Sequence, residues 1–179
     1  MTLRKALRAG TSEYHNVVDD LFGRFDMSDR RQYAAFLAGH ARVIPVAEQA
    51  LEQGGIYRIV PDWAERRRAD MLRADMTALG CAMPPPIALA AFSSDDELWG
   101  AAYVLEGSKL GGAVLSKRVP ADYPSKYLAY QGPKGAMKAF MDQLDAAASV
   151  DLERAIAAAR SIFAAFRAAA ELELEVSVA

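Results

Sequence analysis

Apolar residues recur at three- and four-residue steps along nearly the whole chain, which is the period of an α-helix with one buried face. In the first segment this stripe passes through Leu3, Leu7, Tyr14, Val17 and Leu21. No run of alternating β-branched residues competes with the helical pattern, so no segment is suited to a half-buried strand. The periodicity therefore predicts an all-α fold.

Helix-starting and helix-breaking residues divide the chain into about six to eight expected helices. Pro45 is expected to kink or interrupt the segment that covers about residues 29–53. The consecutive prolines Pro84–Pro86 exclude regular helix from the connector before the segment that begins near residue 95. The sequence Ser94-Asp95-Asp96-Glu97 has the form of a capping box, which opens a helix. The main expected segments cover about residues 3–22, 29–53, 61–79, 95–119, 134–148 and 151–173.

The composition indicates one globular domain, which we expect to span residues 1–179. Hydrophobic residues make up 53% of the chain and charged residues 25%, a balance that disfavours disorder. The net charge of −2 gives no sign of a nucleic-acid interface, and no segment is apolar enough for a membrane span or a secretion signal. Because Cys81 is the one cysteine, neither an internal disulfide nor a zinc cage can form, so we expect a cytoplasmic protein.

Four glycines interrupt the helix expected after Ser94, although the chain is rich in alanine. They are Gly100, Gly107, Gly111 and Gly112. Each costs roughly 1 kcal/mol relative to alanine inside a helix, so together they cost on the order of 4 kcal/mol. Because Gly100, Gly107 and Gly111 fall within about 40° of one another around the helix axis, one strip of this helix is expected to carry no side chains.

Two kinds of neighbour could lie against this bare strip. Gly107 and Gly111 form a G-x-x-x-G pattern, which allows a second helix to approach closely. The same lack of side chains also allows a flat ligand to contact the backbone. The spacing alone leaves both alternatives open.

The chain has two histidines, His15 and His40, in different settings. His15 lies at the border of the first apolar stripe, whereas His40 lies near Tyr33, Phe36 and Leu37 and is expected to be a core or pocket residue. Two histidines without cysteine or glutamate partners cannot build a metal site from protein ligands alone. One histidine is nevertheless enough for haem, whose iron has four equatorial nitrogens of its own.

The histidine and glycine segments together resemble the heme oxygenase family. Residues 7–15, LRAGTSEYH, match the family pattern L-[KR]-x-x-T-x-x-x-H, which ends in the proximal haem ligand. Residues 103–112, YVLEGSKLGG, match the Y-x-x-x-G-x-x-x-G-G of the distal helix, which passes over the haem face. The second motif is most similar to bacterial members, including those that supply biliverdin to phytochromes, and the resemblance covers essentially the whole chain.

This resemblance implies a single-domain helical bundle in which haem is sandwiched between the first helix and a kinked, glycine-rich distal helix. It implies that His15 ligates the iron, and that Gly107 and Gly111 let the distal backbone crowd bound dioxygen. Arg8 matches a basic position that would pair with a haem propionate, for which a planar guanidinium is well suited. The remaining haem-binding residues that it implies are Tyr103, Gly112 and Lys138.

Ser108 departs from the family pattern. Many members carry an aspartate directly after the first distal glycine, where it organises the water chain that delivers protons. A serine hydroxyl can donate and accept hydrogen bonds, but it has no charge near neutral pH. Ser108 is therefore the candidate catalytic residue beside Gly107 and Gly111, and the proton route and the position of ring cleavage stay open.

The function that the resemblance implies is cleavage of haem to biliverdin, carbon monoxide and iron, with dioxygen and electrons from a ferredoxin or a flavin reductase. A bacteriophytochrome is a candidate acceptor of the biliverdin. Ser108 keeps a second function open, namely a haem-binding protein without enzymatic activity. A third alternative shares the fold but not the haem, as thiamin-degrading enzymes with a cysteine nucleophile do; Cys81, just before the prolines, is a poor match to such a nucleophile.

Other charged residues are expected to lie in solvent. The run Glu65-Arg66-Arg67-Arg68 is expected to form a solvated helix face, which could contribute to docking of an electron donor. Lys109 is expected to point to solvent.

Overall fold

The computed structural model describes residues 1–178, which form helices and loops with no strand among them. The prediction of an all-α fold is therefore confirmed. The helices and one 3-10 turn are α1 (Leu3–Phe22), α2 (Arg30–Ala41), α3 (Ile44–Gly54), η1 (Ile56–Arg58), α4 (Trp63–Arg66), α5 (Ala69–Ala78), α6 (Asp95–Ser116), α7 (Lys126–Ala129), α8 (Ala136–Ala146) and α9 (Leu152–Val178).

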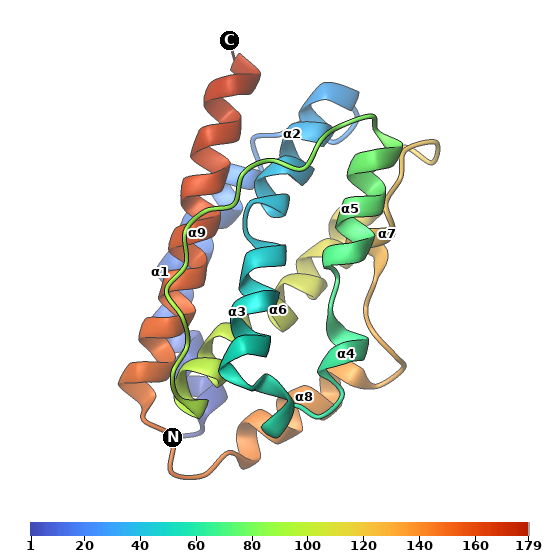
Figure 1. Ribbon diagram of the computed structural model, residues 1–179. Coiled ribbons are helices and arrows are strands. Elements are labelled where there is room, and N and C mark those ends of the chain that lie inside the picture. Colours follow the sequence, from blue (N-terminus) through green and yellow to red (C-terminus); the bar gives the residue numbers. More distant parts are fainter. Residues whose placement is uncertain (179) are drawn as a thin grey trace.

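Two long helices, α1 and α9, run side by side along one edge of the molecule (Figure 1). α9 also packs against α6 and α2, so it connects helices that are far apart in the sequence. α6 contacts α9, α3 and α7, which places the glycine-bearing helix inside the bundle. α1 and α6 both pack against α9, so a ligand bound between α1 and α6 would contact both helices.

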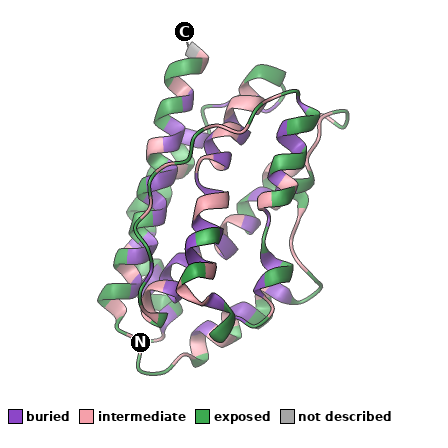
Figure 2. Ribbon diagram, viewed as in Figure 1, coloured by how far each residue is buried: buried purple, intermediate pink, exposed green. Residues whose placement is uncertain are grey.

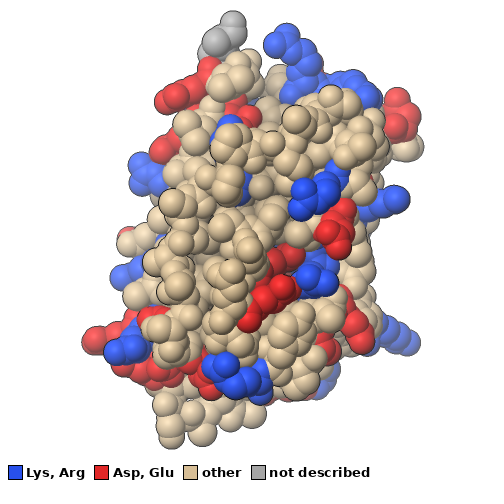
Figure 3. Space-filling model, in the orientation of Figure 1, with Lys and Arg blue, Asp and Glu red and all other residues tan. Residues whose placement is uncertain are grey.

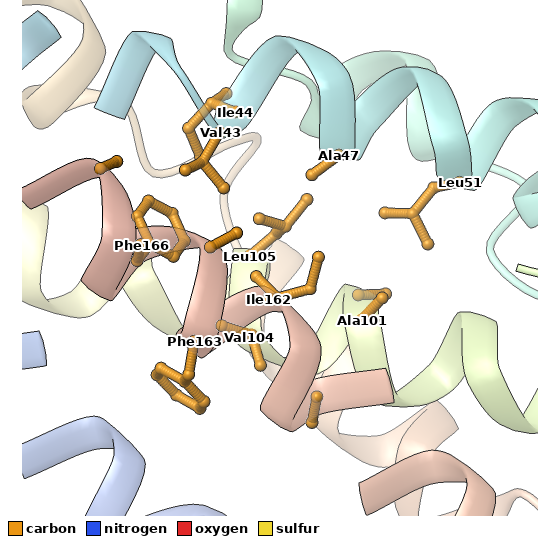
Figure 4. Packing of buried hydrophobic residues seen from close by; sticks show 14 of the residues in the cluster. Val43, Ile44, Ala47, Leu51, Ala101, Val104, Leu105, Ile162, Phe163 and Phe166 are labelled. Atoms are coloured by element: carbon orange, nitrogen blue, oxygen red, sulfur yellow. The ribbon is translucent and has the colours of Figure 1, made fainter. Parts of the chain in front are cut away.

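The apolar core joins α3, α6 and α9 (Figure 4). Ile44 and Leu51 of α3 point toward Leu105 of α6 and Ile162 of α9, and all four are buried. Burial of one such side chain stabilises the fold by about 1.5–3 kcal/mol. In Figure 2 buried residues lie mainly on the helix faces that turn toward the interior, and exposed residues mainly on the outer faces.

The second expected segment is divided into α2 and α3 by a break at Arg42 and Val43. Pro45 lies in the first turn of α3, where its missing N–H leaves no helical hydrogen bond unmade. Gly55 ends α3 in the left-handed conformation (φ 90°), which glycine adopts at no steric cost. The expectation that Pro45 interrupts this segment is confirmed.

The third expected segment is also divided, between α4 and α5, which the sequence pattern did not predict. Arg67 is extended there (φ −62°, ψ 146°). The buried carboxylate of Glu48, from α3, accepts hydrogen bonds from the backbone N–H groups of Arg68 (2.6 Å) and Ala69 (3.1 Å). Glu48 thereby caps the start of α5, and this contact comes from a helix some twenty residues earlier in the chain.

α6 begins close to where the capping-box pattern predicts. The Oγ of Ser94 accepts a hydrogen bond from the N–H of Glu97 (3.3 Å). The carboxylate of Glu97 accepts from the N–H of Ser93 (2.6 Å), one residue earlier than in the usual box. The connector before α6 crosses the face formed by α2, α3 and α9 (Figure 1), where Ile87 donates its N–H to the carbonyl of Arg42 (2.9 Å).

The surface carries charged side chains of both signs. On the face shown in Figure 3 they are interspersed, with no extended basic stripe, in agreement with the net charge of −2. Among the helices of residues 1–178, none combines the length and the apolar character needed to cross a membrane.

Candidate functional site

A cavity of about 470 Å³ lies between α1 and α6 and extends inward to α2, α7 and α9. Its mouth is formed by residues of α1 and α6, and its inner end by aromatic residues and a buried arginine. Most of its lining is apolar, as in sites that bind a flat organic ligand. The lining residues used below are Arg8, His15, Phe36, His40, Arg68, Tyr103, Gly107, Ser108, Gly111, Gly112, Tyr127 and Phe163.

His15 lines this cavity from α1, and its side chain is 57% exposed. Its Nδ1 lies 3.2 Å from Oδ2 of Asp19, one helical turn later, and its ring meets Phe163 edge-on at 5.9 Å. A carboxylate at Nδ1 favours a proton on that nitrogen and leaves Nε2 unprotonated and available to a ligand. Asp19 was not singled out in the sequence, although its i+4 spacing from His15 was a usable signal.

No three His, Cys, Asp or Glu side chains within residues 1–178 come together in a way that could hold a metal ion. A metal at His15 would therefore need its other ligands from a cofactor. Haem meets this requirement, because the porphyrin supplies four nitrogens and the protein supplies one axial ligand. The chemistry of the available donors thus fits haem and does not fit a bare ion.

The four glycines of α6 have two different environments. A Cβ built at Gly107 or Gly111 would meet no atom within 4 Å, so the backbone there is open toward the cavity. A Cβ at Gly100 would lie 1.9 Å from the carbonyl oxygen of Ala155 in α9. The expectation of one bare strip that includes Gly100 is therefore wrong, because α9 packs directly against that part of the helix.

Gly112 has both kinds of neighbour. It lines the cavity, as the resemblance to heme oxygenases implied, but a Cβ there would lie 2.9 Å from the carbonyl oxygen of Leu128. The two alternatives left open by the G-x-x-x-G spacing, close packing and ligand approach, thus apply to different glycines of the same helix. Gly107 and Gly111 are on the ligand side.

The polar residues that the resemblance implied for haem binding are only partly brought together. Arg8 and Tyr103 both line the cavity from α1 and α6. Burial raises the pKa of the Tyr103 hydroxyl, and the positive charges of Arg8 and Arg4 oppose this increase. Lys138 is not among the lining residues; it is 83% exposed on α8 and pairs with Asp142 at 2.5 Å.

Arg68 lies at the inner end of the cavity, where the sequence pattern did not place it. It is 3% exposed, and its Nη2 donates hydrogen bonds to Oγ of Ser108 (2.5 Å) and to the carbonyl of Leu105 (3.1 Å). Its guanidinium stacks over the ring of Tyr127 at 4.7 Å. A permanent positive charge therefore contacts the serine that replaces the usual aspartate.

His40 also lies at the inner end, which confirms the expectation of a core or pocket residue. Its Nδ1 is 2.7 Å from the hydroxyl of Tyr127, and its ring stacks on Phe36 at 4.6 Å. Burial, with the positive charge of Arg68 adding to it, lowers the pKa of His40 to about 3. Burial also raises the pKa of Tyr127 to about 12, so both groups are neutral at physiological pH.

Three cations expected in solvent are buried instead. Arg66 and Arg68 are 1% and 3% exposed, and Lys109 is 1% exposed. The break between α4 and α5 turns Arg66 and Arg68 inward, while Arg67 points outward and pairs with Glu52. The expectation of a solvated face for this run is therefore wrong, and Arg66 and Arg68 cannot form a docking surface.

No protein-family model matches the chain. A heme oxygenase of Xanthomonas campestris pv. campestris (strain 8004) is 34% identical to it, in an alignment that covers 77% of this chain and 88% of the relative. The heme oxygenase of Neisseria meningitidis, solved with NO and CO bound, superposes with a TM-score of 0.82 over 98% of this chain and 93% of that one, at 22% identity. The heme oxygenase of Leptospira interrogans superposes with a TM-score of 0.74 over 96% and 100% of the two chains, at 21% identity.

The identity to the Xanthomonas protein extends over most of both chains, and the two solved structures share the helical fold. These findings agree with the cavity between His15 and the open glycines of α6. The chain belongs to the heme oxygenase family.

Proposed function

We propose that this protein binds haem in the cavity between α1 and α6 and cleaves it to biliverdin, carbon monoxide and iron. The observation that carries the proposal is the pairing of His15 on one wall with the bare backbone of Gly107 and Gly111 on the other. The cavity is bounded by one histidine nitrogen and by one surface without side chains. A planar group that carries its own metal would use both of these features.

His15 would hold the haem iron through Nε2. Asp19, 3.2 Å from Nδ1, holds the ring in orientation and increases the basicity of the ligating nitrogen. Phe163 supports the ring from the edge at 5.9 Å. Bound haem supplies the redox chemistry with dioxygen, while the protein binds, orients and shields it.

Gly107 and Gly111 bring helix backbone, rather than side chains, over the open face of the haem. This limits the space in which dioxygen can lie and so restricts the ring carbons within its reach. Arg8, which lines the cavity, would hold a haem propionate, because its guanidinium can form paired hydrogen bonds with a carboxylate. Tyr103 and Gly112 complete the contacts, and Lys138 would reach a propionate only after leaving Asp142.

Ser108 and Arg68 together take the place of the usual distal aspartate. The Ser108 hydroxyl donates to the carbonyl of Leu105 (2.7 Å) and accepts from Arg68 (2.5 Å), so its own proton is already engaged. An arginine stays protonated in proteins, so Arg68 would donate hydrogen bonds and orient water but would not release a proton. Protons would therefore reach the site through water that Arg68 and Ser108 orient.

Electrons for the reaction come from a ferredoxin or a flavin reductase, and a bacteriophytochrome is the acceptor we expect for the biliverdin. We place the reaction in the cytoplasm, in accordance with the single cysteine of the chain. These partners follow from the resemblance to bacterial family members that supply biliverdin to phytochromes.

The test is a visible spectrum during stoichiometric addition of haemin, followed by ascorbate or a reductase in air. We expect a Soret band that decays into the broad red absorption of biliverdin. His15→Ala should abolish normal histidine ligation, whereas His40→Ala, the matched control at the other histidine, should retain it. A normal histidine-ligated spectrum in the His15 variant would refute the assignment.

A stable Soret band without biliverdin would favour the alternative of a haem-binding protein that lacks turnover. Ser108 is the residue that favours this alternative, so Ser108→Asp would then be the variant to examine. No Soret band at all would exclude both functions.

A further inference from the structure

Three charged side chains are buried together on the side of α6 that faces away from the cavity. Glu106 accepts hydrogen bonds from Nη1 of Arg66 (2.9 Å) and from Nζ of Lys109 (2.6 Å). None of these three side chains is more than 1% exposed, and none lines the cavity. We refer to Arg66, Glu106 and Lys109 as the ion triad.

The ion triad contacts the turn of α6 that contains Gly107 and Gly111, on the side opposite the cavity. At about 100° per residue, Lys109 points about 160° away from both Gly107 and Gly111. On the cavity side of this turn, no atom lies within 4 Å of a Cβ at either glycine. Apart from the hydrogen bonds of Arg68 to Ser108 and Leu105, no contact on the cavity side holds the turn in the haem-free protein, so its position depends largely on contacts from behind.

Those contacts tie the turn to other parts of the bundle. Nη1 of Arg66 also donates to the carbonyl of Ala136 at the start of α8 (3.1 Å), and its Nε donates to Asp62 (3.0 Å). The Nε2 of Gln131 donates to the carbonyl of Lys109 (2.8 Å). The back of the turn is thus connected to α4, to α8 and to the loop that follows α7.

Buried ion pairs are a poor source of stability. The desolvation of each charge roughly cancels the attraction between them, and apolar residues of similar volume often give equal or greater stability. Hydrogen-bonded charges do have directional geometry, which apolar contacts lack. The triad is therefore better suited to defining where the turn lies than to stabilising the fold as a whole.

We propose that the ion triad is a positioning device, which sets how closely the Gly107–Gly111 backbone approaches the bound haem. Its three members are positioning residues, since none of them touches the cavity. The inference rests on the proposed function for the presence of haem, but the position and mobility of the turn can be measured without it.

The test compares Arg66→Met with Arg67→Met, in the full-length protein. Arg67 is the matched control, because it is the adjacent arginine and forms an exposed pair with Glu52 at 3.1 Å. In the haem-free protein, Arg66→Met should speed amide hydrogen exchange at residues 107–112 by about tenfold or more, and Arg67→Met should leave it unchanged. In the haem–CO complex, Arg66→Met should shift the CO stretching frequency and change the CO dissociation rate.

A second variant separates positioning from folding. Arg66→Met/Glu106→Leu/Lys109→Met removes all three buried charges, and the partner of Arg66 that remains, Asp62, is 39% exposed and can be solvated, so this variant should fold with near-normal stability. We expect it to show the same faster exchange and the same shift in CO frequency. A loss of stability in either variant with unchanged exchange at 107–112 and an unchanged CO frequency would overturn the proposal.

The two proposals fail in distinguishable ways. If the wild-type protein binds no haem, the proposed function is wrong, and the exchange measurement still tests the triad. If haem is bound and cleaved but the Arg66 and Arg67 variants behave alike, only the positioning role is wrong.

Discussion

Gly107 and Gly111 differ from Gly100 and Gly112 in their surroundings, although all four belong to α6. A Cβ at Gly100 would lie 1.9 Å from a backbone oxygen of α9, and a Cβ at Gly112 would lie 2.9 Å from a backbone oxygen of α7. At Gly107 and Gly111 a Cβ would meet nothing within 4 Å. One pair permits close packing of backbone, and the other pair leaves a cavity wall bare.

The difference shows that the two pairs of glycines affect stability in opposite directions. At Gly100 and Gly112, the conformational cost of glycine is offset by contacts that a larger residue would prevent. On the cavity side, the cost of roughly 1 kcal/mol per glycine has no compensating contact in the haem-free protein. Stability that is given up at a bare surface is typical of a binding site.

Gly100→Ala should have the largest effect on stability. Its Cβ would collide with the backbone carbonyl of Ala155, and because neither a Cβ nor a helix carbonyl can rotate away, relief requires α6 and α9 to separate. We expect a loss of about 3 kcal/mol or more, the upper part of the range for overpacking. Urea unfolding of the haem-free protein measures it, and an unchanged midpoint would mean that the two backbones are not in contact there.

His40, which also lines the cavity, should make the folded protein less stable as the pH falls. The pKa of His40 is lowered from 6.5 to about 3, so between these values the unfolded chain binds a proton that the folded protein does not. The free energy of unfolding should therefore fall as the pH falls below about 6.5, by about 2 kcal/mol at about pH 5. The measurement is the free energy of unfolding of the wild type and of His40→Gln as a function of pH. Equal dependence on pH in the two proteins would contradict the prediction.

Gly112→Ala should be less harmful than Gly100→Ala. The clash at 2.9 Å is with Leu128 in the four-residue helix α7, which can shift by a few tenths of an ångström more easily than α9. The helical preference of alanine offsets part of the strain, so we expect a net loss of about 1 kcal/mol. A loss equal to that of Gly100→Ala would mean that α7 is as rigid as α9.

Gly111→Ala should have the smallest effect on stability and the opposite sign. With no neighbour within 4 Å, the new methyl group adds helix propensity and stabilises the haem-free protein by about 1 kcal/mol. In the haem-bound protein the same methyl group would enter the distal space, so biliverdin formation should slow. If Gly111→Ala destabilises the haem-free protein, the cavity wall is not bare and the contrast between the two pairs disappears.

Much of the fold could be predicted from periodicity. α1, α6 and α9 lie close to the expected segments, because each is long and carries a continuous apolar face. The break between α4 and α5 could not be predicted, because the group that caps α5 is the carboxylate of Glu48 on another helix. A contact between distant segments leaves no periodic signal at the break itself.

The sequence by itself determined the residue types of the candidate site and their order along the chain. His15, Arg8, Tyr103 and the glycines at 107, 111 and 112 were all expected there, and the structure brings them to one cavity while leaving Lys138 outside it. Only the tertiary structure decided which glycines are bare and which are packed, and which cations are buried. The physical reason is that spacing along a helix gives the direction of a residue, whereas its neighbour on that side is supplied by a distant part of the chain.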